Sequence, residues 1–433
     1  MSALTGSIGL DFGTTNSSIA LVRPDQSVQL ARFSYRGAFT ESFRSLLYLE
    51  RLREGHRNII KSWSGPQGIE RYLSAEEKGR LIQSLKSFLS SRSLQTTEIF
   101  GRSFKLEQLI AKILRDIRMQ AQEEFGSEID TAVVGRPVRY VGSESGADDE
   151  YAVSRLTHAL NEAGFGRVHF ELEPVAAAYH YESTLDHDEL ILIGDFGGGT
   201  SDFSLLRVGP GIRSAGHNRR DVLGNEGLPL AGDAFDARIV RHLVSPALGA
   251  GSELDSNGKL LPVPNWVYFK LERWHHLSFL RSTETLAMLK SVAAQALEPK
   301  KLQALLYLVQ HDLGYQLHQA VQRVKVTLSH AERTAFRFSH AEIELEAEVT
   351  RADFERWIGD ELQAIEEHVS RLLARTGLHA HDIDRVFLTG GSSFVPAVRH
   401  IFESRFGAGK IRSGDEFTSV ARGLALRGLT PVT

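Results

Sequence analysis

The feature that most constrains the fold is an internal duplication of a short segment. Residues Ile8 to Val22 read IGLDFGTTNSSIALV, and residues Ile193 to Val208 read IGDFGGGTSDFSLLRV. Each copy has an apolar run that ends in Asp, a turn rich in Gly and Thr, and a second run of apolar and β-branched residues. Two strands joined by a tight turn form a β-hairpin. The repeat therefore predicts two hairpins of the same design in two related halves of the chain.

The turn of the first copy carries groups that bind phosphate and a cation. In this turn Asp11 precedes Gly13, Thr14, Thr15 and Asn16. Backbone N–H groups and hydroxyls of such a turn can be aimed at phosphate oxygens, and Asp at the end of a strand can hold a hydrated divalent cation. Taken alone, the segment is equally compatible with a plain hairpin turn, because Gly and Thr are common in turns and strands.

The second copy favours the phosphate interpretation. It contains three successive glycines, a run that weakens a strand unless another group approaches its backbone closely. The polar and glycine residues of this turn are Asp195, Gly197, Gly198, Gly199, Thr200 and Asp202. Two turns of this kind can grip one polyphosphate from opposite sides. We therefore expect Asp11 and Asp195 to share one Mg²⁺ ion.

Between and after the hairpins, the apolar pattern alternates between the periods of helices and strands. Helices are predicted over Leu106 to Phe125 and Tyr151 to Ala163, with a buried strand over Thr131 to Gly135 between them. In the second half, a helix capped by Thr350 is expected to run to Gly377, and a strand is expected over Arg385 to Thr389. This alternation is typical of an α/β protein.

The length of 433 residues is too great for one ordinary core, and the duplication suggests how the chain divides. Lobe I is predicted over residues 1–189 together with a C-terminal helix in 415–433, and lobe II over 190–414. Two regions break the alternation and are predicted to be inserted subdomains, about 34–103 in lobe I and about 225–329 in lobe II. Long apolar-periodic helices dominate the second insert from residue 254 onward.

Charge and cysteine content limit the partners and the compartment. The chain has 50 Lys and Arg against 54 Asp and Glu, so its formal charge of −4 creates no strong field for nucleic acid or anionic lipid. It has no cysteines, which excludes disulfides and thiolate metal sites. No segment is apolar for long enough to cross a bilayer. We therefore expect a cytoplasmic protein that binds neither nucleic acid nor membranes.

The two turn motifs resemble the phosphate motifs of the actin, sugar-kinase and heat-shock ATPase superfamily, and the first is most similar to that of DnaK-type chaperones. Three further stretches resemble that family, and all of the stretches follow the family's order along the chain. They are Leu172 to Ala178 (LEPVAAA, the connecting helix), Leu230 to Asp236 (LAGDAFD, in the second lobe) and Leu388 to Pro396 (LTGGSSFVP, the adenosine motif). The resemblance implies an α/β, actin-like ATPase fold, in which two tandem ribonuclease-H-like lobes, each with an inserted subdomain, flank a nucleotide cleft.

The resemblance also implies roles for individual residues. Glu173 would orient the attacking water, Asp195 would support water and metal, and Asp11 would anchor the Mg²⁺ shell. Lys86 falls where heat-shock ATPases carry a lysine that contacts the transferred phosphate. Phosphoryl transfer needs positioning and charge stabilisation more than covalent catalysis, and these side chains suit both tasks. The alternatives are a Glu173 that only favours the helix dipole and a Lys86 on the solvated face of a helix.

Adenine recognition departs from the family pattern on one helix. Gln322 and Val326 replace an acidic residue and an arginine of the helix that resembles the adenine-contacting one, whereas Lys325 and Ser329 remain. An aliphatic surface at Val326 can still pack against a purine, but it removes one stacked cation.

The adenosine motif shows a second departure. Gly390, Gly391 and Ser392 are retained, but Phe394 stands where chaperones of this family often have an arginine. An aromatic surface can pack against a purine and can change the base preference. We expect ATP or ADP as the ligand together with Mg²⁺, and the resemblance also allows K⁺.

The chain ends at Thr433, where chaperones of this family continue through a linker into a β-sandwich that holds peptide. We therefore expect a short YegD-type relative without the peptide-binding domain, and Gly135 to Val138 (GRPV) is consistent with that subgroup. The implied function is slow, Mg²⁺-dependent ATP hydrolysis that drives opening and closing of the lobes. A nucleotide-dependent regulator that does not hydrolyse ATP is the alternative, and a small-molecule kinase fits less well.

The aromatic residues of the second insert have two interpretations. Trp266, Phe269, Trp274 and Leu277 most simply form the core of this insert. An exposed patch that binds a protein partner, through residues 254–329, is the alternative.

Overall fold

The computed structural model describes residues 6–55, 57–75, 79–182, 185–215, 222–273, 280–341, 343–413 and 419–429. These residues separate into two compact units. The large unit comprises Met1–Ala231, Ile365–Ser393 and Arg399–Thr433, and the small unit comprises Gly232–Ala364 and Phe394–Val398. These two units are defined by which residues pack together, whereas the predicted lobes were defined by the repeated segments. The predicted lobe boundaries therefore stay a prediction.

The first sheet of the large unit contains the first copy of the repeat. Its strands are β1 (Ser7–Phe12), β2 (Asn16–Val22), β3 (Val28–Leu30), β6 (Phe43–Arg44), β12 (Thr131–Arg136) and β13 (Arg167–Leu172). They follow the order β13-β12-β1-β2-β3, and β6 also pairs with β2. β1 and β2 are antiparallel, whereas β12 runs parallel to β1 on its other side. The predicted first hairpin and the predicted strand that begins at Thr131 are confirmed.

The second sheet, also in the large unit, contains the second copy. Its strands are β14 (Glu189–Phe196), β15 (Ser201–Val208), β16 (Val222–Leu228), β21 (Arg385–Thr389) and β22 (Ile411–Ser413). They follow the order β16-β15-β14-β21-β22. β14 and β15 form an antiparallel hairpin, and β21 runs parallel to β14. Each sheet thus has a hairpin with a parallel strand beside its first strand, which confirms the predicted duplication and the α/β class.

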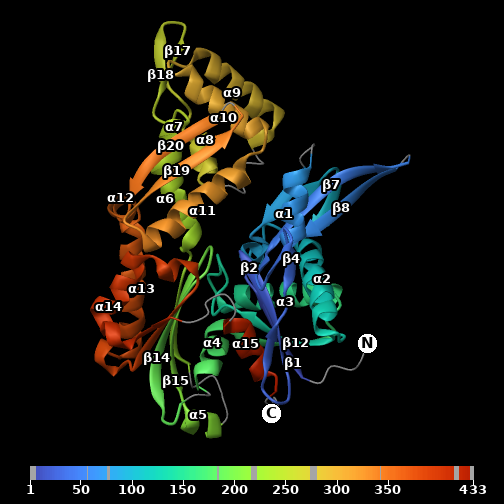
Figure 1. Ribbon diagram of the computed structural model, residues 1–433, viewed down its shortest axis with the longest axis vertical. Coiled ribbons are helices and arrows are strands. Elements are labelled where there is room, and N and C mark those ends of the chain that lie inside the picture. Colours follow the sequence, from blue (N-terminus) through green and yellow to red (C-terminus); the bar gives the residue numbers. More distant parts are fainter. Residues whose placement is uncertain are drawn as a thin grey trace. The chain divides into compact units, whose positions relative to one another are not determined.

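Helices cover both faces of the first sheet (Figure 1). They are α2 (Leu106–Phe125), α3 (Gly146–Glu162) and α15 (Ser419–Arg427). α2 and α3 pack on the face that presents Leu10, and α15 packs on the opposite face against Ala20. Side chains alternate along a strand, so Asp11 lies on the face opposite to Leu10. The predicted helix over residues 106–125 is confirmed, and α3 begins five residues earlier than the predicted start at Tyr151.

The second sheet is covered in the same way. Its helices are α4 (Glu173–Glu182), α5 (Pro210–Ala215), α13 (Gly359–Thr376) and α14 (Pro396–Phe406). α4 packs against Ile191 and Ile193 of β14. On the opposite face, the ring of Phe196 contacts Phe402 of α14 edge-to-face, with centroids 6.1 Å apart. By the alternation of β14, Asp195 lies on the face that α4 covers.

α4 and α15 lie side by side and bring their backbones into contact (Figure 1). A Cβ atom at Gly423 would lie 1.7 Å from the carbonyl oxygen of Ala176. No side chain fits at this crossing, which therefore requires glycine. α4 packs on both sheets, against Val133 of the first and Ile193 of the second.

The first predicted insert forms small sheets of its own within the large unit. Its elements are β4 (Phe33–Tyr35), β5 (Ala38–Thr40), β7 (Leu46–Glu54), β8 (Arg57–Ser64), α1 (Gly65–Ser74), β9 (Arg80–Gln83), β10 (Thr96–Ile99) and β11 (Arg102–Lys105). β7 is the central strand of the order β8-β7-β9. A short 3₁₀ helix over Leu85–Phe88 follows β9, and the chain then reaches β10 without another regular element.

The small unit combines helices with two hairpins. Its elements are α6 (Gly232–Ile239), a π-helix over Val240–Val244, α7 (Ser245–Ala247), β17 (Glu253–Ser256), β18 (Lys259–Pro262), α8 (Trp266–Leu271), α9 (Thr283–Gln295), α10 (Pro299–Gln310), α11 (Gly314–His330), β19 (Arg333–His340), β20 (Ile343–Thr350) and α12 (Arg351–Trp357). The helices predicted after residue 254 are confirmed. No helix in the described part of the chain is long and apolar enough to cross a membrane.

The helix predicted from Thr350 to Gly377 is wrong in one respect. Its cap is present, because the Thr350 side chain accepts a hydrogen bond from the Asp353 backbone N–H. The run is divided at Ile358, where α12 ends and α13 begins. Gly359 follows directly, and glycine costs about 1 kcal/mol relative to alanine inside a helix.

The predicted aromatic core of the second insert is also corrected. Trp266 and Phe269 are exposed, whereas Val267, Tyr268 and Leu271 of the same helix are buried. The helical period places these three on the inner face of α8 and leaves the two larger rings outside. Trp274 and Leu277 lie outside the described residues.

Candidate functional site

Three acidic residues meet where α4 begins, in the large unit. Asp11 lies near the end of β1, Asp195 lies near the end of β14, and Glu173 is the first residue of α4. Both aspartates are on sheet faces that α4 covers, so strand alternation directs them toward the same helix terminus. Asp202 of β15 is the direct cross-strand partner of Asp195. Four buried or half-buried carboxyl groups thus share one region.

The electrostatics of this cluster are dominated by burial and by mutual repulsion. Burial, and next the charge of Glu173, raise the pKa of Asp11 to about 8, although Lys86 opposes the shift. Burial also raises the pKa of Asp195, and burial and the charge of Asp195 raise the pKa of Asp202 well above its usual value. Each carboxylate therefore makes its neighbours harder to ionise.

Lys86 is the cation of this cluster. Its Nζ lies 2.6 Å from Oε1 of Glu173, and the two side chains are only 8% and 12% exposed. Burial opposes the lysine charge, but Glu173 and Asp11 together hold the pKa of Lys86 above its ordinary value. The interpretation of Lys86 as part of a solvated helical face is wrong, because the residue lies buried in the 3₁₀ helix.

The first turn is held by its own backbone and by the first insert. A Cβ atom at Gly13 would lie 2.1 Å from the carbonyl oxygen of Asn16, which shows how tightly the turn closes. Thr15 O accepts a hydrogen bond from Ser45 N at 2.9 Å, and Asn16 Oδ1 accepts one from Arg44 at 3.3 Å. The Thr15 carbonyl and the Asn16 side chain therefore fix this turn.

The second turn faces the first. Gly197 N donates to the carbonyl oxygen of Thr200 at 2.8 Å, and Gly198 and Gly199 lie half-buried between them. A Cβ atom placed on Gly199 would lie 4.0 Å from Cγ2 of Thr14 and 3.9 Å from Oγ of Ser87. The two glycine-rich turns and the 3₁₀ helix of Lys86 therefore lie close together within the large unit.

Two residues of this region were missed by the sequence analysis. Thr389 donates from Oγ1 to Oδ1 of Asp195 at 2.6 Å and fixes the orientation of that carboxylate. The signal that could have found it is the predicted strand ending at Thr389, because parallel pairing sets this residue opposite Asp195. Ser87 follows Lys86 and lies near Gly199 of the second turn, but a lone serine in the sequence gives no comparable signal.

The predicted adenosine motif is divided between the two units. Gly390, Gly391 and Ser392 belong to the large unit, where Gly390 has φ +82° and Ser392 is buried. They lie directly after β21, whose last residue is Thr389. The strand that orients Asp195 thus continues into this motif.

The remaining predicted base contacts lie in the small unit. Lys325 Nζ lies 2.8 Å from Oδ1 of the buried Asp236 and donates to Gly232 O at 3.0 Å. Ser329 Oγ donates to Lys325 O at 3.1 Å. The charge of Lys325 is therefore already paired within the unit, and its amine holds α11 against the start of α6.

An exposed apolar surface lies beside these residues in the small unit. Val326 is 59% exposed and Phe394 is 44% exposed. The Phe394 ring lies 6.4 Å from the ring of His330, which is four residues after Val326 on the same helix. Val326 and Phe394, which stand where the family that the sequence resembles has arginines, are thus exposed to solvent.

The topology and the cluster together define a class of protein. A duplicated hairpin-based α/β core, with two glycine-rich turns facing one another, is the actin-like ATPase fold. The family model for "Hsp70 protein" matches residues 77–259 and 308–430. This chain belongs to the Hsp70 family.

The curated relatives that the chain matches are chaperones. The chain is 24% identical over 425 residues to the chaperone protein DnaK of Thermosipho africanus, and 24% identical over 427 residues to that of Thermosipho melanesiensis. Both matches cover 97% of this chain and 58% of the relative. Members of the Hsp70 family bind adenine nucleotides and are ATPases.

Proposed function

We propose that this protein binds Mg²⁺–ATP at the carboxylate cluster and hydrolyses it slowly. The observation that carries the proposal is the convergence of Asp11, Glu173 and Asp195 with the buried Lys86, beside two facing glycine-rich turns. Membership of a family of ATPases supports the same conclusion.

The cluster fits a hydrated Mg²⁺ ion. The raised pKa values of Asp11 and Asp195 reflect crowded, buried negative charge, and a divalent cation relieves that crowding. Among the described residues, no three His, Asp or Glu side chains are arranged to hold a metal ion. Mg²⁺ keeps several of its waters, so Asp11 and Asp195 would hold those waters rather than the ion directly. When bound, Mg²⁺ neutralises charge on the phosphate oxygens.

Glu173 and Lys86 would act on the attacking water and on the transferred phosphate. Lys86 donates to Oε1 of Glu173, so the other carboxylate oxygen accepts the hydrogen bond that orients the water. Lys86 Nζ would also stabilise negative charge that grows on the phosphate oxygens, and removing such a group costs roughly 100-fold or more in rate. Thr389 would keep the Asp195 carboxylate turned toward the metal shell.

The two turns would hold the phosphates through their backbone N–H groups, as glycine-rich turns commonly do. Gly13, Thr14, Gly198 and Gly199 would supply these groups, and the proximity of Gly199 to Thr14 supports this. Contact of both turns with the γ-phosphate would bias the relative position of the two hairpins, which is the proposed chaperone-like switch.

We propose adenine as the base of the nucleotide. The residues proposed to contact the nucleoside are Gly390, Gly391, Ser392, Lys325, Ser329 and Phe394. The exposed Val326 and Phe394 favour packing against a flat ring over ion pairing.

The protein would also bind a second cation, work in one compartment and contact a protein partner. K⁺ would accompany Mg²⁺, and the protein would act in the cytoplasm. A protein partner would bind through residues 254–329, where Trp266 and Phe269 are exposed.

A nucleotide-dependent regulator without turnover is the second candidate, and one observation favours it. Lys86 Nζ donates to Oε1 of Glu173 at 2.6 Å, so one of the two carboxylate oxygens is already engaged by the protein.

Substitution of Glu173 by Gln separates the two candidates. Calorimetry with ATP, ADP and GTP, with and without Mg²⁺, measures binding, and phosphate release measures turnover. Catalysis predicts that Glu173→Gln binds ATP within about threefold of wild type and loses about 100-fold in rate. The matched control is Glu171→Gln, because Glu171 pairs with Arg427 at 3.1 Å and lies on β13 two residues earlier.

The outcomes are distinct. If the wild-type protein binds nucleotide but releases no phosphate, it is the regulator. If the wild-type protein binds no nucleoside triphosphate with Mg²⁺, both candidates are refuted.

A further inference from the structure

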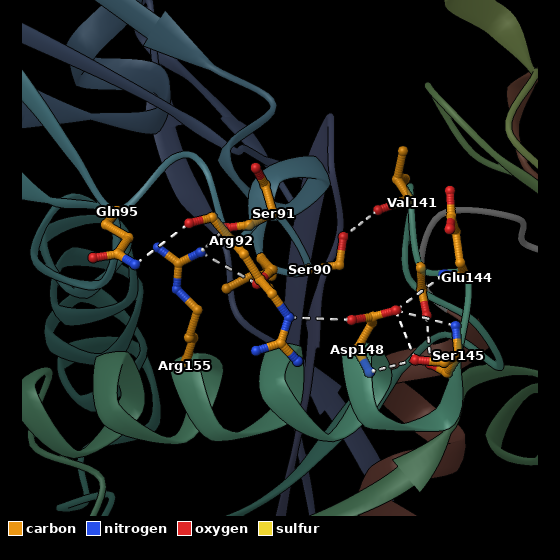
Figure 2. A network of polar contacts seen from close by, with 11 residues as sticks. Ser90, Ser91, Arg92, Gln95, Val141, Glu144, Ser145, Asp148 and Arg155 are labelled. Carbon is orange, nitrogen blue, oxygen red and sulfur yellow. Dashed lines mark hydrogen bonds and ion pairs between the residues drawn. The ribbon is translucent and has the colours of Figure 1, made fainter.

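A buried arginine holds the segment that carries Lys86. Arg155 projects from α3 and is only 3% exposed (Figure 2). Its guanidinium donates to main-chain carbonyl oxygens within a seven-residue stretch and to one carboxylate. The acceptors are Phe88 O at 3.2 Å, Leu89 O at 3.3 Å, Ser91 O at 3.0 Å, Leu94 O at 3.0 Å and Glu107 Oε1 at 2.5 Å.

The segment that Arg155 holds has few regular hydrogen bonds of its own. Ser84 has the left-handed φ of 58°, which is unfavourable for a residue other than glycine. The 3₁₀ helix that follows is closed by Ser87 N to Ser84 O at 3.1 Å and by Leu89 N to Lys86 O at 3.2 Å. Short 3₁₀ helices have poor hydrogen-bond geometry, so this segment depends on contacts from outside.

Two further contacts attach the same segment to the start of α3 and to the loop before it. Arg92 lies 3.4 Å from Asp148, whose carboxylate also accepts from the capping Ser145 (Figure 2). Ser90 donates to Val141 O. Arg92 is largely exposed, so its ion pair contributes little by itself. The buried guanidinium is therefore the contact that fixes the segment.

α3 is placed to hold both partners of the Lys86–Glu173 pair. The chain leaves α3, forms β13 and reaches Glu173 as the first residue of α4. Arg155, on the same helix, binds the carbonyl of Phe88 two residues after Lys86. One helix is thereby connected to the lysine by hydrogen bonds and to the glutamate by the next strand.

We infer that Arg155 is a positioning residue for the phosphoryl-transfer site, and that it acts by fixing Lys86 Nζ against Glu173. This inference rests on the proposed ATPase function. A guanidinium can serve several carbonyls at once because its donors form a rigid fork, whereas the single ammonium of lysine cannot reproduce that geometry. The neighbouring Glu107 supplies the counter-charge that a buried guanidinium needs.

The test compares Arg155→Lys with Arg118→Lys. Arg118 is a half-buried arginine of the same unit, which donates to Ile129 O at 2.6 Å and has no connection to residues 85–94 in any described contact. Arg155→Lys should lower the single-turnover rate of ATP hydrolysis by about 10- to 100-fold, because small misplacements of catalytic groups have effects of that size. Its Kd for Mg²⁺–ATP should stay within about threefold of wild type, and Arg118→Lys should change neither quantity.

A double-mutant cycle with Lys86→Met separates positioning from general loosening. If Arg155 acts through Lys86, Arg155→Lys should change the residual rate of Lys86→Met by less than about twofold. The same large loss in both backgrounds, or a Kd that weakens in step with the rate, contradicts the inference.

If Arg155→Lys does not fold, Glu107→Gln serves as a second test of the inference. It preserves the guanidinium and its size, removes the counter-charge, and should lower the rate about threefold at unchanged Kd. An unchanged rate contradicts the inference. Wild-type protein that releases no phosphate refutes the proposed catalysis itself, whereas active wild type with an equally active Arg155→Lys refutes only the role of Arg155.

Discussion

The buried ion pair of Lys86 and Glu173 adds little to the stability of the fold, and its position suits a role in chemistry. Burying two charges removes them from water, and their attraction returns only part of that cost. A fold that needed the pair only for stability would gain as much from apolar side chains. Its location beside three further carboxyl groups, those of Asp11, Asp195 and Asp202, is the kind of arrangement found at functional sites.

Gly390 offers a residue-scale prediction about stability. Its φ is +82°, and a Cβ atom there would lie 2.0 Å from the carbonyl oxygen of Phe196. Gly390→Ala should therefore lower the free energy of unfolding by more than about 2 kcal/mol, measured by urea denaturation. Gly377→Ala is the control, because Gly377 has φ +69° with no atom within 4 Å, and it should cost about 1 kcal/mol. Equal losses in the two variants would show that the contact with Phe196 does not matter.

At this scale the sequence reveals residues that belong to local motifs and conceals those that act across the fold. Asp11 and Asp195 could be selected because each ends an apolar run before a glycine-rich turn. Thr389 reaches Asp195 across 194 residues, and Arg155 reaches Phe88 across 67. No local pattern encodes such contacts, because they depend on strand pairing and helix packing.

Elements with strong periodicity were predictable, and breaks in them were not. The helix over residues 106–125 was placed at its observed bounds, because it has a long apolar stripe. The division at Ile358 interrupts an amphipathic pattern that continues through it. The exposure of Trp266 and Phe269 was also not predicted. Both rings were assigned to a core because of their size, without asking which face of α8 is buried.

A prediction at the scale of elements concerns the π-helix and α12 in the small unit. His242 stacks on Trp357, with ring centroids 5.2 Å apart and planes 7° apart. Burial, followed by the charges of Arg238, Arg241 and Arg356, lowers the pKa of His242 below 6.5, and the more weakly acting Glu272 opposes this shift. NMR titration should give a His242 midpoint below 6.5.

The sign of the effect on stability follows from linkage. The unfolded chain takes up the His242 proton at a higher pH than the folded protein does, so stability should fall as the pH decreases through 6.5. Comparison of urea midpoints at about pH 7.5 and about pH 5.5 tests this. His242→Gln should show a smaller decrease than wild type, and an identical decrease would contradict the assignment.

For the molecule as a whole, the duplication was the most informative property of the sequence. It predicted two hairpins, and strand alternation then placed Asp11 and Asp195 toward the same helix. The division into a large and a small unit was not predicted, because it depends on which surfaces pack rather than on which segments repeat. The roles of the predicted site residues stay predictions until nucleotide binding is measured.

The corresponding prediction for the whole molecule concerns ligand and metal removal. A ligand that binds only the folded state at 100 times its Kd stabilises it by about 2.7 kcal/mol. ATP with Mg²⁺ should therefore raise the thermal midpoint of unfolding, and EDTA should abolish most of that increase. A GTP sample at the same concentration serves as the control for base preference. An increase that survives EDTA would contradict the proposed part of Asp11 and Asp195 in holding the metal.

The crossing of α4 and α15 has a mechanical consequence. The helices touch through main-chain atoms at Gly423 and Ala176, beside the packed side chains of Val420 and Leu424. A small change of angle at this contact becomes a large displacement at the far ends of the two helices. The crossing would thus set the axis of any rotation between the two sheets, and any side chain at position 423 would force the two helices apart.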